Sequence, residues 1–120
     1  MFSLTSSLNY YLYNGATDMR KSFDGLCGLV SGNLNRNPMN GEVFIFINKR
    51  RDRIKLLHWE PGGFMLYYKR LESGTIELPR WDRTVTGYQI LWSDLMLMIE
   101  GISLQKIQRR KRYILTKQCA

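Results

Sequence analysis

One of the longest apolar stretches of the chain lies near its middle, where Val43–Ile47 consists only of β-branched and aromatic residues. Such a run is typical of a buried strand. Arg53–Trp59 begins with alternating polar and apolar residues, which predicts a strand with one buried and one exposed face. A third run, Phe64–Arg70, follows the turn Glu60–Gly63. Three such runs joined by short turns predict an antiparallel meander.

The turn between the first two runs fixes how they pair. If Asn48 faces Arg53 across the polar turn Lys49–Asp52, apolar positions of one strand meet apolar positions of the other. The matched pairs are Ile45 with Leu56 and Ile47 with Ile54, and His58 falls opposite Val43. The agreement of these pairs supports this register.

Upstream of the meander, the pattern predicts one strand and one helix. The aromatic run Tyr10–Tyr13 ends at a turn signal, Asn14-Gly15, and is typical of a strand. From Asp18 to Ser31 apolar residues recur at helical spacing, and Thr17 stands where an N-cap is expected. The residues that share this helix face are Met19, Phe23, Leu26, Cys27 and Val30.

Downstream of the meander, the pattern is weaker. Thr75–Leu78 can add a short edge strand, and Tyr88–Leu91 fits either a strand or the entry to a helix. Ser93 is a suitable N-cap for a short helix that ends or frays at Gly101. The apolar face of that helix comprises Leu95, Met98, Ile99 and Ile102.

These elements predict an α+β fold: a single domain with an antiparallel β-meander sheet and two or three helices packed against it. We expect the domain to span residues 1–104 and a basic C-terminal extension to span residues 105–120. No apolar run exceeds five residues, whereas a membrane-spanning helix needs about 20. The start of the chain lacks the pattern of a signal peptide, and two cysteines are too few for a disulfide framework. We therefore expect a cytoplasmic protein without a membrane partner.

Charge sharpens the expectation about partners. The 120 residues include 18 Lys or Arg and 10 Asp or Glu, a formal net charge of +8, which favours a polyanionic partner. Two basic clusters stand out, at Lys49–Lys55 and at Lys106–Lys117. Cations beside aromatic residues suit phosphates and stacked bases, although a solvated sheet face with a basic tail, or a membrane-surface segment, would explain the same clusters. The predicted nucleic-acid contacts are Arg50, Arg51, Arg53, Lys55, Lys69, Arg70, Arg109, Arg110, Lys111 and Arg112.

Candidate catalytic residues are few. The single histidine, His58, lies on a predicted strand, where a structural role competes with one as a general base. One histidine and two distant cysteines do not form a zinc site, and no phosphate-binding glycine motif is present. A magnesium-dependent nuclease would need converging carboxylates, but ion pairing and helix capping explain the available ones more simply. These carboxylates are Asp18, Asp24, Asp52 and Glu72. We therefore expect no enzyme activity, no metal site and no cofactor.

Three segments of the chain look familiar in combination. Residues 17–26 read TDMRKSFDGL, residues 50–57 read RRDRIKLL, and residues 68–74 read YKRLESG. In this order they resemble the signature of the small accessory protein, often called TnpB, of the insertion sequence 66 family of bacterial transposons. The similarity extends over about residues 8–104 and takes in Pro38, Trp59 and the closing Glu100-Gly101-Ile102.

The resemblance implies a biological process, DNA transposition by a mobile element, and leaves the mechanism open. Family members are encoded beside a small helix-turn-helix protein and a large transposase that carries the acidic catalytic residues. Strand transfer is assigned to that transposase, so the resemblance also argues against catalysis by this chain. The basic extension over residues 105–120 lies outside the similarity.

Beside the less favoured metal-dependent nuclease, two functions remain open at this point. The leading one is a non-catalytic accessory factor that binds DNA, either transposon ends or any duplex, through the basic sheet face and tail. The alternative is an adaptor that binds the large transposase without direct DNA contact. Exposed aromatic residues would serve that role, although burial in the core is the simpler explanation for Trp92. The candidate contacts of such an adaptor are Trp81, Tyr88 and Trp92.

Arg20 and Lys21 form a further candidate surface. Capping and packing explain most of their neighbours in residues 17–26, but they do not require these two cations. An ion pair between Arg20 and Asp24, one helical turn apart, is the structural explanation. A functional surface is the alternative.

Overall fold

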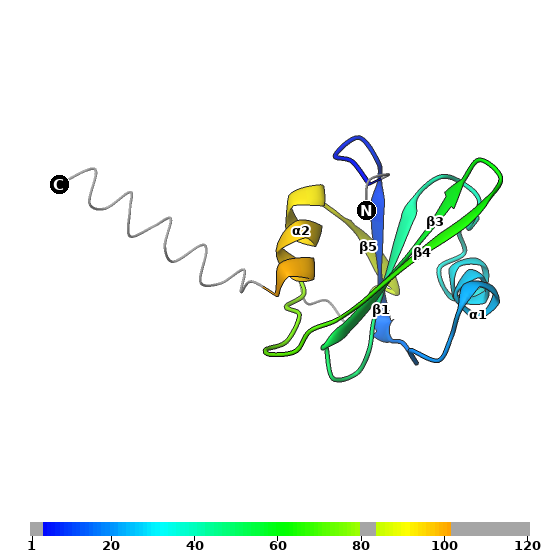
Figure 1. Cartoon of the computed structure of the whole chain (residues 1–120). Helices are drawn as coiled ribbons and strands as arrows, with labels where there is room; N and C mark the ends of the chain where they lie inside the picture. Colours follow the sequence, from blue (N-terminus) through cyan, green and yellow to red (C-terminus); the bar gives the residue numbers. More distant parts are fainter. Residues whose placement is uncertain (1–3, 80–83, 102–120) are drawn as a thin grey trace.

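A mixed β-sheet with a helix on either side organises the chain (Figure 1). This computed structural model describes residues 4–79 and 84–101. Within these residues the sheet has five strands in the order β4-β3-β2-β1-β5, with β1 parallel to β2 and the other neighbours antiparallel. The strands are β1 (Tyr10–Ala16), β2 (Val43–Ile47), β3 (Arg53–Glu60), β4 (Gly63–Arg70) and β5 (Gly87–Ile90).

The predicted α+β class, the meander β2-β3-β4 and its register are confirmed. Ile45 pairs with Leu56, Ile47 with Ile54, and Val43 with His58. The sheet as a whole is mixed. The helical segment after β1 returns the chain to the end of the sheet where β1 begins, so β2 runs parallel to β1.

The helix predicted from Asp18 begins later, because a turn intervenes. Helix α1 spans Phe23–Gly28 and continues as a π-helical segment, η1 (Leu29–Asn33). Thr17 is not its N-cap, since the position before the helix belongs to Ser22. Leu26 and Val30 are buried as predicted, whereas the Phe23 side chain is 42% exposed.

The C-terminal part of the described chain matches the sequence pattern in part. Helix α2 (Trp92–Glu100) follows Leu91 as its N-cap instead of Ser93, and it ends at Gly101, whose left-handed φ is 74°. Leu95, Met98 and Ile99 of its predicted apolar face are buried. The fourth residue of that face, Ile102, lies outside the described residues. Residues 88–90 belong to strand β5, but residues 75–78 form no strand.

Each side of the sheet has its own core. The α2 side buries residues of all strands except β4, together with Ile76 and α2. The α1 side buries a smaller set: Leu26, Val30, Leu34, Phe44, Phe46 and Leu57. The sheet is therefore the middle of three layers, between α1 and α2. No helix within residues 4–79 and 84–101 is long and apolar enough to span a bilayer.

Candidate nucleic-acid interface

The turn between β2 and β3 is held by the side chain of Asn48. Its Oδ1 accepts hydrogen bonds from the backbone N–H groups of Asp52 at 3.1 Å and Arg53 at 3.0 Å. Its Nδ2 donates to Oδ1 of Asp52 at 2.7 Å, and its backbone carbonyl accepts from the N–H of Arg51 at 3.0 Å. The hydrogen bond from Asn48 lowers the pKa of the Asp52 carboxyl below its ordinary value of 3.8. One side chain therefore fixes the path of this turn.

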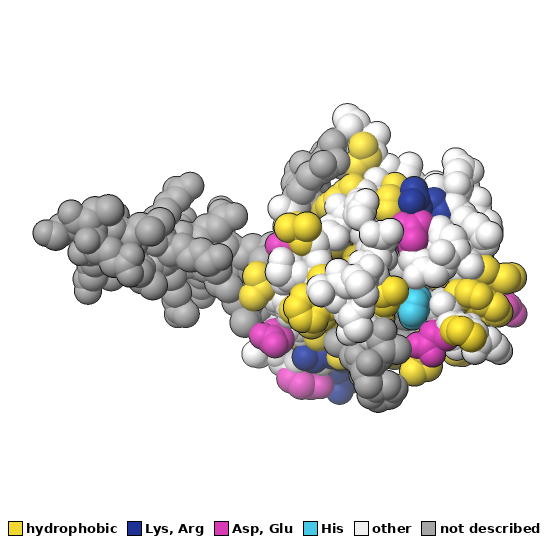
Figure 2. All heavy atoms as spheres, turned by 90° about the horizontal axis from the view of Figure 1, so that it is seen from above, with side chains coloured by type: hydrophobic (Ala, Val, Ile, Leu, Met, Phe, Trp, Pro, Cys, Tyr) yellow, Lys and Arg dark blue, Asp and Glu magenta, His cyan; other side chains and the backbone are white. Residues whose placement is uncertain are grey.

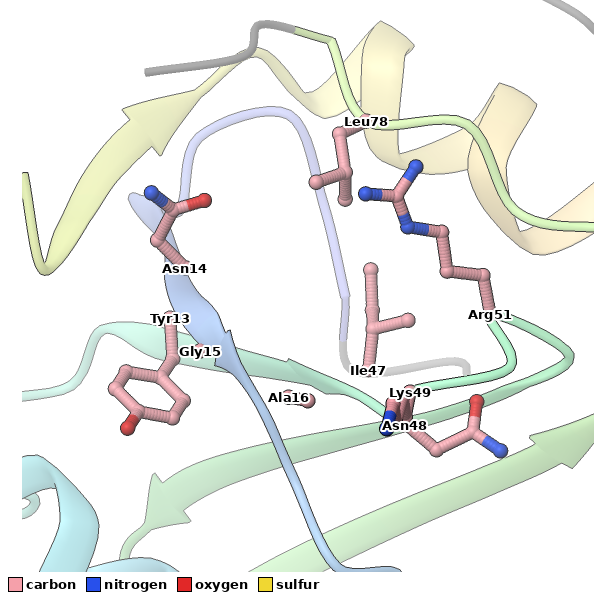
Figure 3. A pocket seen from close by; sticks show the side chains of 9 residues that line it. All are labelled: Tyr13, Asn14, Gly15, Ala16, Ile47, Asn48, Lys49, Arg51 and Leu78. Atoms are coloured by element: carbon pink, nitrogen blue, oxygen red, sulfur yellow. The ribbon is translucent and has the colours of Figure 1, made fainter. Parts of the chain in front are cut away.

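Three consecutive cations, Lys49, Arg50 and Arg51, occupy the turn. Lys49 and Arg50 are exposed, and neither makes an ion pair or side-chain hydrogen bond to any described residue. Arg51 has a left-handed φ of 58°, and its side chain extends past Leu78 on the α2 side of the sheet (Figure 3). With the ends of β1 and β2 it lines a pocket of about 210 Å³. The turn thus presents positive charge to solvent and along this pocket.

Two further cations lie on the α1 side of the sheet. Arg53 and Arg70 stand directly opposite each other on β3 and β4. Arg53 donates from Nη1 to the Tyr68 hydroxyl at 3.3 Å, and Arg70 pairs with the exposed Glu72 at 3.0 Å. Like charges directly opposite each other destabilise a sheet, so stability does not explain this pair. Lys69 projects from the other side of β4 and is separate from it.

Lys55 lies on the same side of the sheet as Arg53 and Arg70, but unlike the predicted contact it does not face solvent. The residue is only 5% exposed, and its ammonium lies 4.6 Å from the centre of the Tyr68 ring. Its Nζ donates to the backbone carbonyls of Met19 at 2.8 Å and Lys21 at 2.7 Å. A buried ammonium with these partners ties β3 to the segment before α1, so it is unavailable as a phosphate ligand.

The segment that precedes α1 forms a tight turn instead of a first helical turn. Asp18 accepts a hydrogen bond at Oδ1 from the backbone N–H of Arg20 at 2.9 Å. The Arg20 guanidinium also donates hydrogen bonds to this carboxylate, from Nε at 3.0 Å and from Nη2 at 2.7 Å. These bonds lower the pKa of Asp18 to about 2. The predicted pair between Arg20 and Asp24 is therefore replaced by one within the turn. Despite this pair, the Arg20 side chain is 91% exposed.

The β2–β3 turn and the segment before α1 lie at the same end of the sheet (Figure 1). Between them is a shallow hollow of about 400 Å³. Two of the three segments that carry the family resemblance, residues 17–26 and 50–57, therefore meet in space. The hollow is lined by Thr17, Asp18, Met19, Arg20, Asn48, Lys49, Arg50 and Arg53. We call this group, together with Lys21 and Arg70, the basic corner.

The described fold is nearly balanced in charge, and its excess of positive charge is confined to one region. Residues 4–79 and 84–101 contain ten Lys and Arg and nine Asp and Glu, whereas residues 102–120 contain six Lys and Arg and no acidic residue. On the face seen in Figure 2, Lys and Arg form only small groups, each next to a carboxylate. The basic corner therefore differs from its surroundings by its excess of cations. The predicted contacts Arg109, Arg110, Lys111 and Arg112 lie outside the described residues.

The other candidate residues do not assemble into a catalytic constellation within the described part of the chain. His58 is buried opposite Val43, and its Nδ1 lies 3.7 Å from Oε1 of Glu60, without a hydrogen bond to either atom. No three His, Cys, Asp or Glu side chains among these residues could hold a metal ion together. Three of the four carboxylates considered for a nuclease are instead engaged separately: Asp18 pairs with Arg20, Asp52 with Asn48, and Glu72 with Arg70.

The aromatic residues considered for an adaptor behave differently from one another. Tyr88 is buried at 7% exposure in the α2-side core, so it is not a surface contact. Trp92 is 36% exposed and its neighbour Leu91 is 68% exposed, both at the start of α2. Trp81 lies outside the described residues.

Sequence reasoning missed the importance of Asn48. The available signal was an asparagine and an aspartate four positions apart in a polar turn, where both side chains can bond to the backbone. The alternation along β3 also predicted an exposed Lys55, whereas the structure buries it against the backbone carbonyls of Met19 and Lys21, which are distant in the sequence.

The chain matches the family model described as IS66 Orf2 like protein over residues 8–109. It is 39% identical over 93 residues to the uncharacterized protein y4jC of Sinorhizobium fredii, an alignment that covers 78% of each chain. It is also 30% identical over 73 residues to the uncharacterized protein y4hO of the same organism, covering 61% of this chain and 64% of that one. No solved structure matches it. The match includes all three segments of the resemblance, so the chain belongs to the family of IS66 Orf2-like proteins, accessory proteins of insertion sequence 66 transposons.

Proposed function

We propose that this protein is a non-catalytic accessory factor that binds DNA through the basic corner during transposition. The observation that carries the proposal is the gathering of exposed cations where residues 17–21 meet the β2–β3 turn. Lys49 and Arg50 have no ion-pair partner among the described residues, and Arg53 faces Arg70 despite their like charge. An interface for phosphates explains an arrangement that stability alone does not favour.

The chemistry of the corner fits the DNA backbone better than the base edges. Guanidinium and ammonium groups bind phosphate oxygens without reading sequence. A shallow hollow lies between the turn and residues 17–20, so the corner has room for a phosphate strand. The six cations of residues 106–117 add to this attraction, because each neutralised phosphate releases counterions. The expected ligand is therefore double-stranded DNA with little sequence preference, including transposon ends.

The test is the salt dependence of duplex binding, measured by fluorescence anisotropy with the full chain. Affinity should fall steeply as salt rises, with a logarithmic slope of about 0.9 for each phosphate neutralised. Replacing Lys49 and Arg50 by Gln should weaken binding and reduce that slope by about 1 per lost contact. Both side chains are exposed, so the double variant should melt at the temperature of the unchanged protein.

A matched control separates the corner from net charge. Gln89→Glu with Ser93→Glu lowers the net charge by the same amount at exposed positions of β5 and α2. This control should bind DNA much more tightly than the Lys49→Gln, Arg50→Gln protein. An equal loss of DNA affinity in both proteins would show that overall charge, and not the corner, attracts DNA. Undetectable binding at low salt would contradict the proposal as a whole.

A second function, an adaptor for the large transposase, is favoured by Leu91 and Trp92. These two adjacent side chains form a small exposed apolar patch at the start of α2, and large apolar side chains dominate interface energetics. The test is capture of the transposase at high salt in the presence of nuclease, where DNA cannot bridge the two proteins. Leu91→Asp should abolish that capture while leaving DNA binding unchanged. Capture that depends on Lys49 and Arg50 instead would favour DNA bridging.

A further inference from the structure

Strand β4 forms one edge of the sheet, and its outer side is open within the described residues. It pairs with β3 through eight consecutive residue pairs, from Glu60 with Gly63 to Arg53 with Arg70. No described strand lies on its other side. An edge of this length presents a row of unpaired backbone groups, which is a template for another strand.

The hairpin geometry tells which backbone groups point outward. Only Pro61 and Gly62 separate the closing pair, Glu60 and Gly63, and in such a hairpin the closing residues bond to each other. Hydrogen-bonded and non-hydrogen-bonded pairs then alternate along the ladder. The odd-numbered residues of β4 therefore bond to β3, and the outward N–H and C=O groups belong to Phe64, Leu66, Tyr68 and Arg70.

The features by which proteins usually block an edge are largely missing from β4. Its ladder has no bulge, and the strand contains no proline. Its cations, Lys69 and Arg70, are confined to the C-terminal end. Apolar side chains occupy the remainder, with Met65 exposed by 43% and Tyr68 by 48%. The opposite edge, β5, is only four residues long and offers half the length for pairing.

We propose that the β4 edge binds the β4 edge of a second copy of this chain, antiparallel and centred on Tyr67, which joins two sheets into one. This register uses every residue from Phe64 to Arg70 and satisfies all the outward backbone groups with about eight interchain hydrogen bonds. Tyr67 then faces its own copy in a pair without hydrogen bonds.

The side chains of β4 complement themselves in this register. Phe64 lies opposite the partner's Arg70, which suits a cation–π contact, and Leu66 lies opposite the partner's Tyr68. Met65 lies opposite the partner's Lys69, so the cations of the two strands fall at opposite ends. Parallel pairing would instead bring the cations of both strands together, at a cost in free energy. Charge thus favours the antiparallel over the parallel pairing, and the complementary side chains of β4 make a second copy the occupant that fits this edge.

The first test is the mass of the full chain in solution against concentration, by light scattering or sedimentation at high salt, where nucleic acid does not bridge copies. Leu66→Pro removes one outward N–H without removing a bond to β3, since proline is tolerated at an edge. Leu66→Ala is the matched control, because it shortens the same side chain and keeps the N–H. We expect dimers for the unchanged protein and for Leu66→Ala, and at least about tenfold weaker dimers for Leu66→Pro. If the unchanged protein is a monomer at all concentrations, or if Leu66→Pro and Leu66→Ala dimerise with equal affinity, the proposal is overturned.

A cysteine cross-link tests the register, and it does so without proline. In a background with Cys27 and Cys119 replaced by Ser, Tyr67→Cys should form a disulfide-linked dimer under mild oxidation. Residues opposite each other in a pair without hydrogen bonds have Cα atoms about 4.5 Å apart, within the range of a disulfide. Met65→Cys is the control, because its counterpart is the partner's Lys69, and it should cross-link much more slowly. Faster cross-linking of Met65→Cys than of Tyr67→Cys would overturn the register. Thermal melting of each variant confirms that it is folded.

Discussion

The two hairpin turns of the meander reverse the chain in different ways. The β3–β4 turn consists of Pro61 and Gly62, and the glycine takes the left-handed conformation, with φ of 97°. The β2–β3 turn is longer, and a left-handed position there, with φ of 58°, belongs to Arg51. Glycine adopts this conformation without penalty, whereas a residue with a side chain pays about 1 kcal/mol. The β2–β3 turn also needs the side chain of Asn48 to fix its path.

The contrast indicates what each turn is for. The β3–β4 turn is the shorter of the two and places a glycine at its left-handed position. The β2–β3 turn keeps an arginine in a strained position and places Lys49 and Arg50 beside it without ion-pair partners among the described residues. Strain that persists in a folded protein points to a functional constraint. We therefore expect substitutions in the β3–β4 turn to affect stability alone, and substitutions in the β2–β3 turn to affect DNA binding as well.

The largest expected effect follows from Asn48→Ala. It leaves the backbone N–H groups of Asp52 and Arg53 and the carboxylate of Asp52 without their partner. Losing such hydrogen bonds at a partly buried position should lower the free energy of unfolding by about 2–3 kcal/mol, measured by urea denaturation. DNA affinity should also fall, because the cations lose their fixed placement. A variant as stable as the unchanged protein would show that the turn is held by other contacts.

Gly62→Ala should have the next largest effect, and on stability alone. Alanine at a φ of 97° is strained even though nothing lies within 4 Å of the added Cβ. We expect the free energy of unfolding to fall by about 1–2 kcal/mol. DNA affinity, measured by anisotropy on the folded variant, should stay unchanged. Reduced affinity would place the β3–β4 turn in the interface and weaken the contrast between the two turns.

The strands of the meander could be predicted from the sequence because their pattern is local. Unbroken apolar residues in β2 and alternation in β3 fix both the strands and their register, and the family signature marks residues 17–26 and 50–57. The start of α1 could not be predicted, because the Asp18 side chain competes for the backbone N–H of Arg20 and closes a turn there. The burial of Lys55 depends on carbonyl groups 34 and 36 positions away in the chain, which no local pattern reveals.

Arg51→Gly should have a smaller effect on stability, of opposite sign. Glycine removes the strain at φ of 58°, so the free energy of unfolding should change by at most about 1 kcal/mol, towards greater stability. If the Arg51 side chain binds phosphate, DNA affinity should nevertheless fall. Arg51→Lys is the control, since it keeps the charge and the strain. A loss of stability in Arg51→Gly would show that the side chain supports the turn.

The smallest expected effect is the titration of Asp52, which has no counterpart in the β3–β4 turn. The hydrogen bond from Asn48 holds the pKa of this carboxyl below 3.8 in the folded chain. A depressed pKa means that its contribution to stability is fully present above pH 3.8 and is lost as the pH falls through the folded pKa. Carboxyl chemical shifts followed by NMR should give a midpoint below 3.8 in the unchanged protein and a higher one in Asn48→Ala. An identical midpoint in both would assign the shift to the backbone N–H of Asp52 and to the charges of Arg53 and Arg50, which also lower this pKa. Comparing Arg50→Gln would then measure the share of Arg50, so the titration separates the hydrogen bond from Asn48 from the charges beside it.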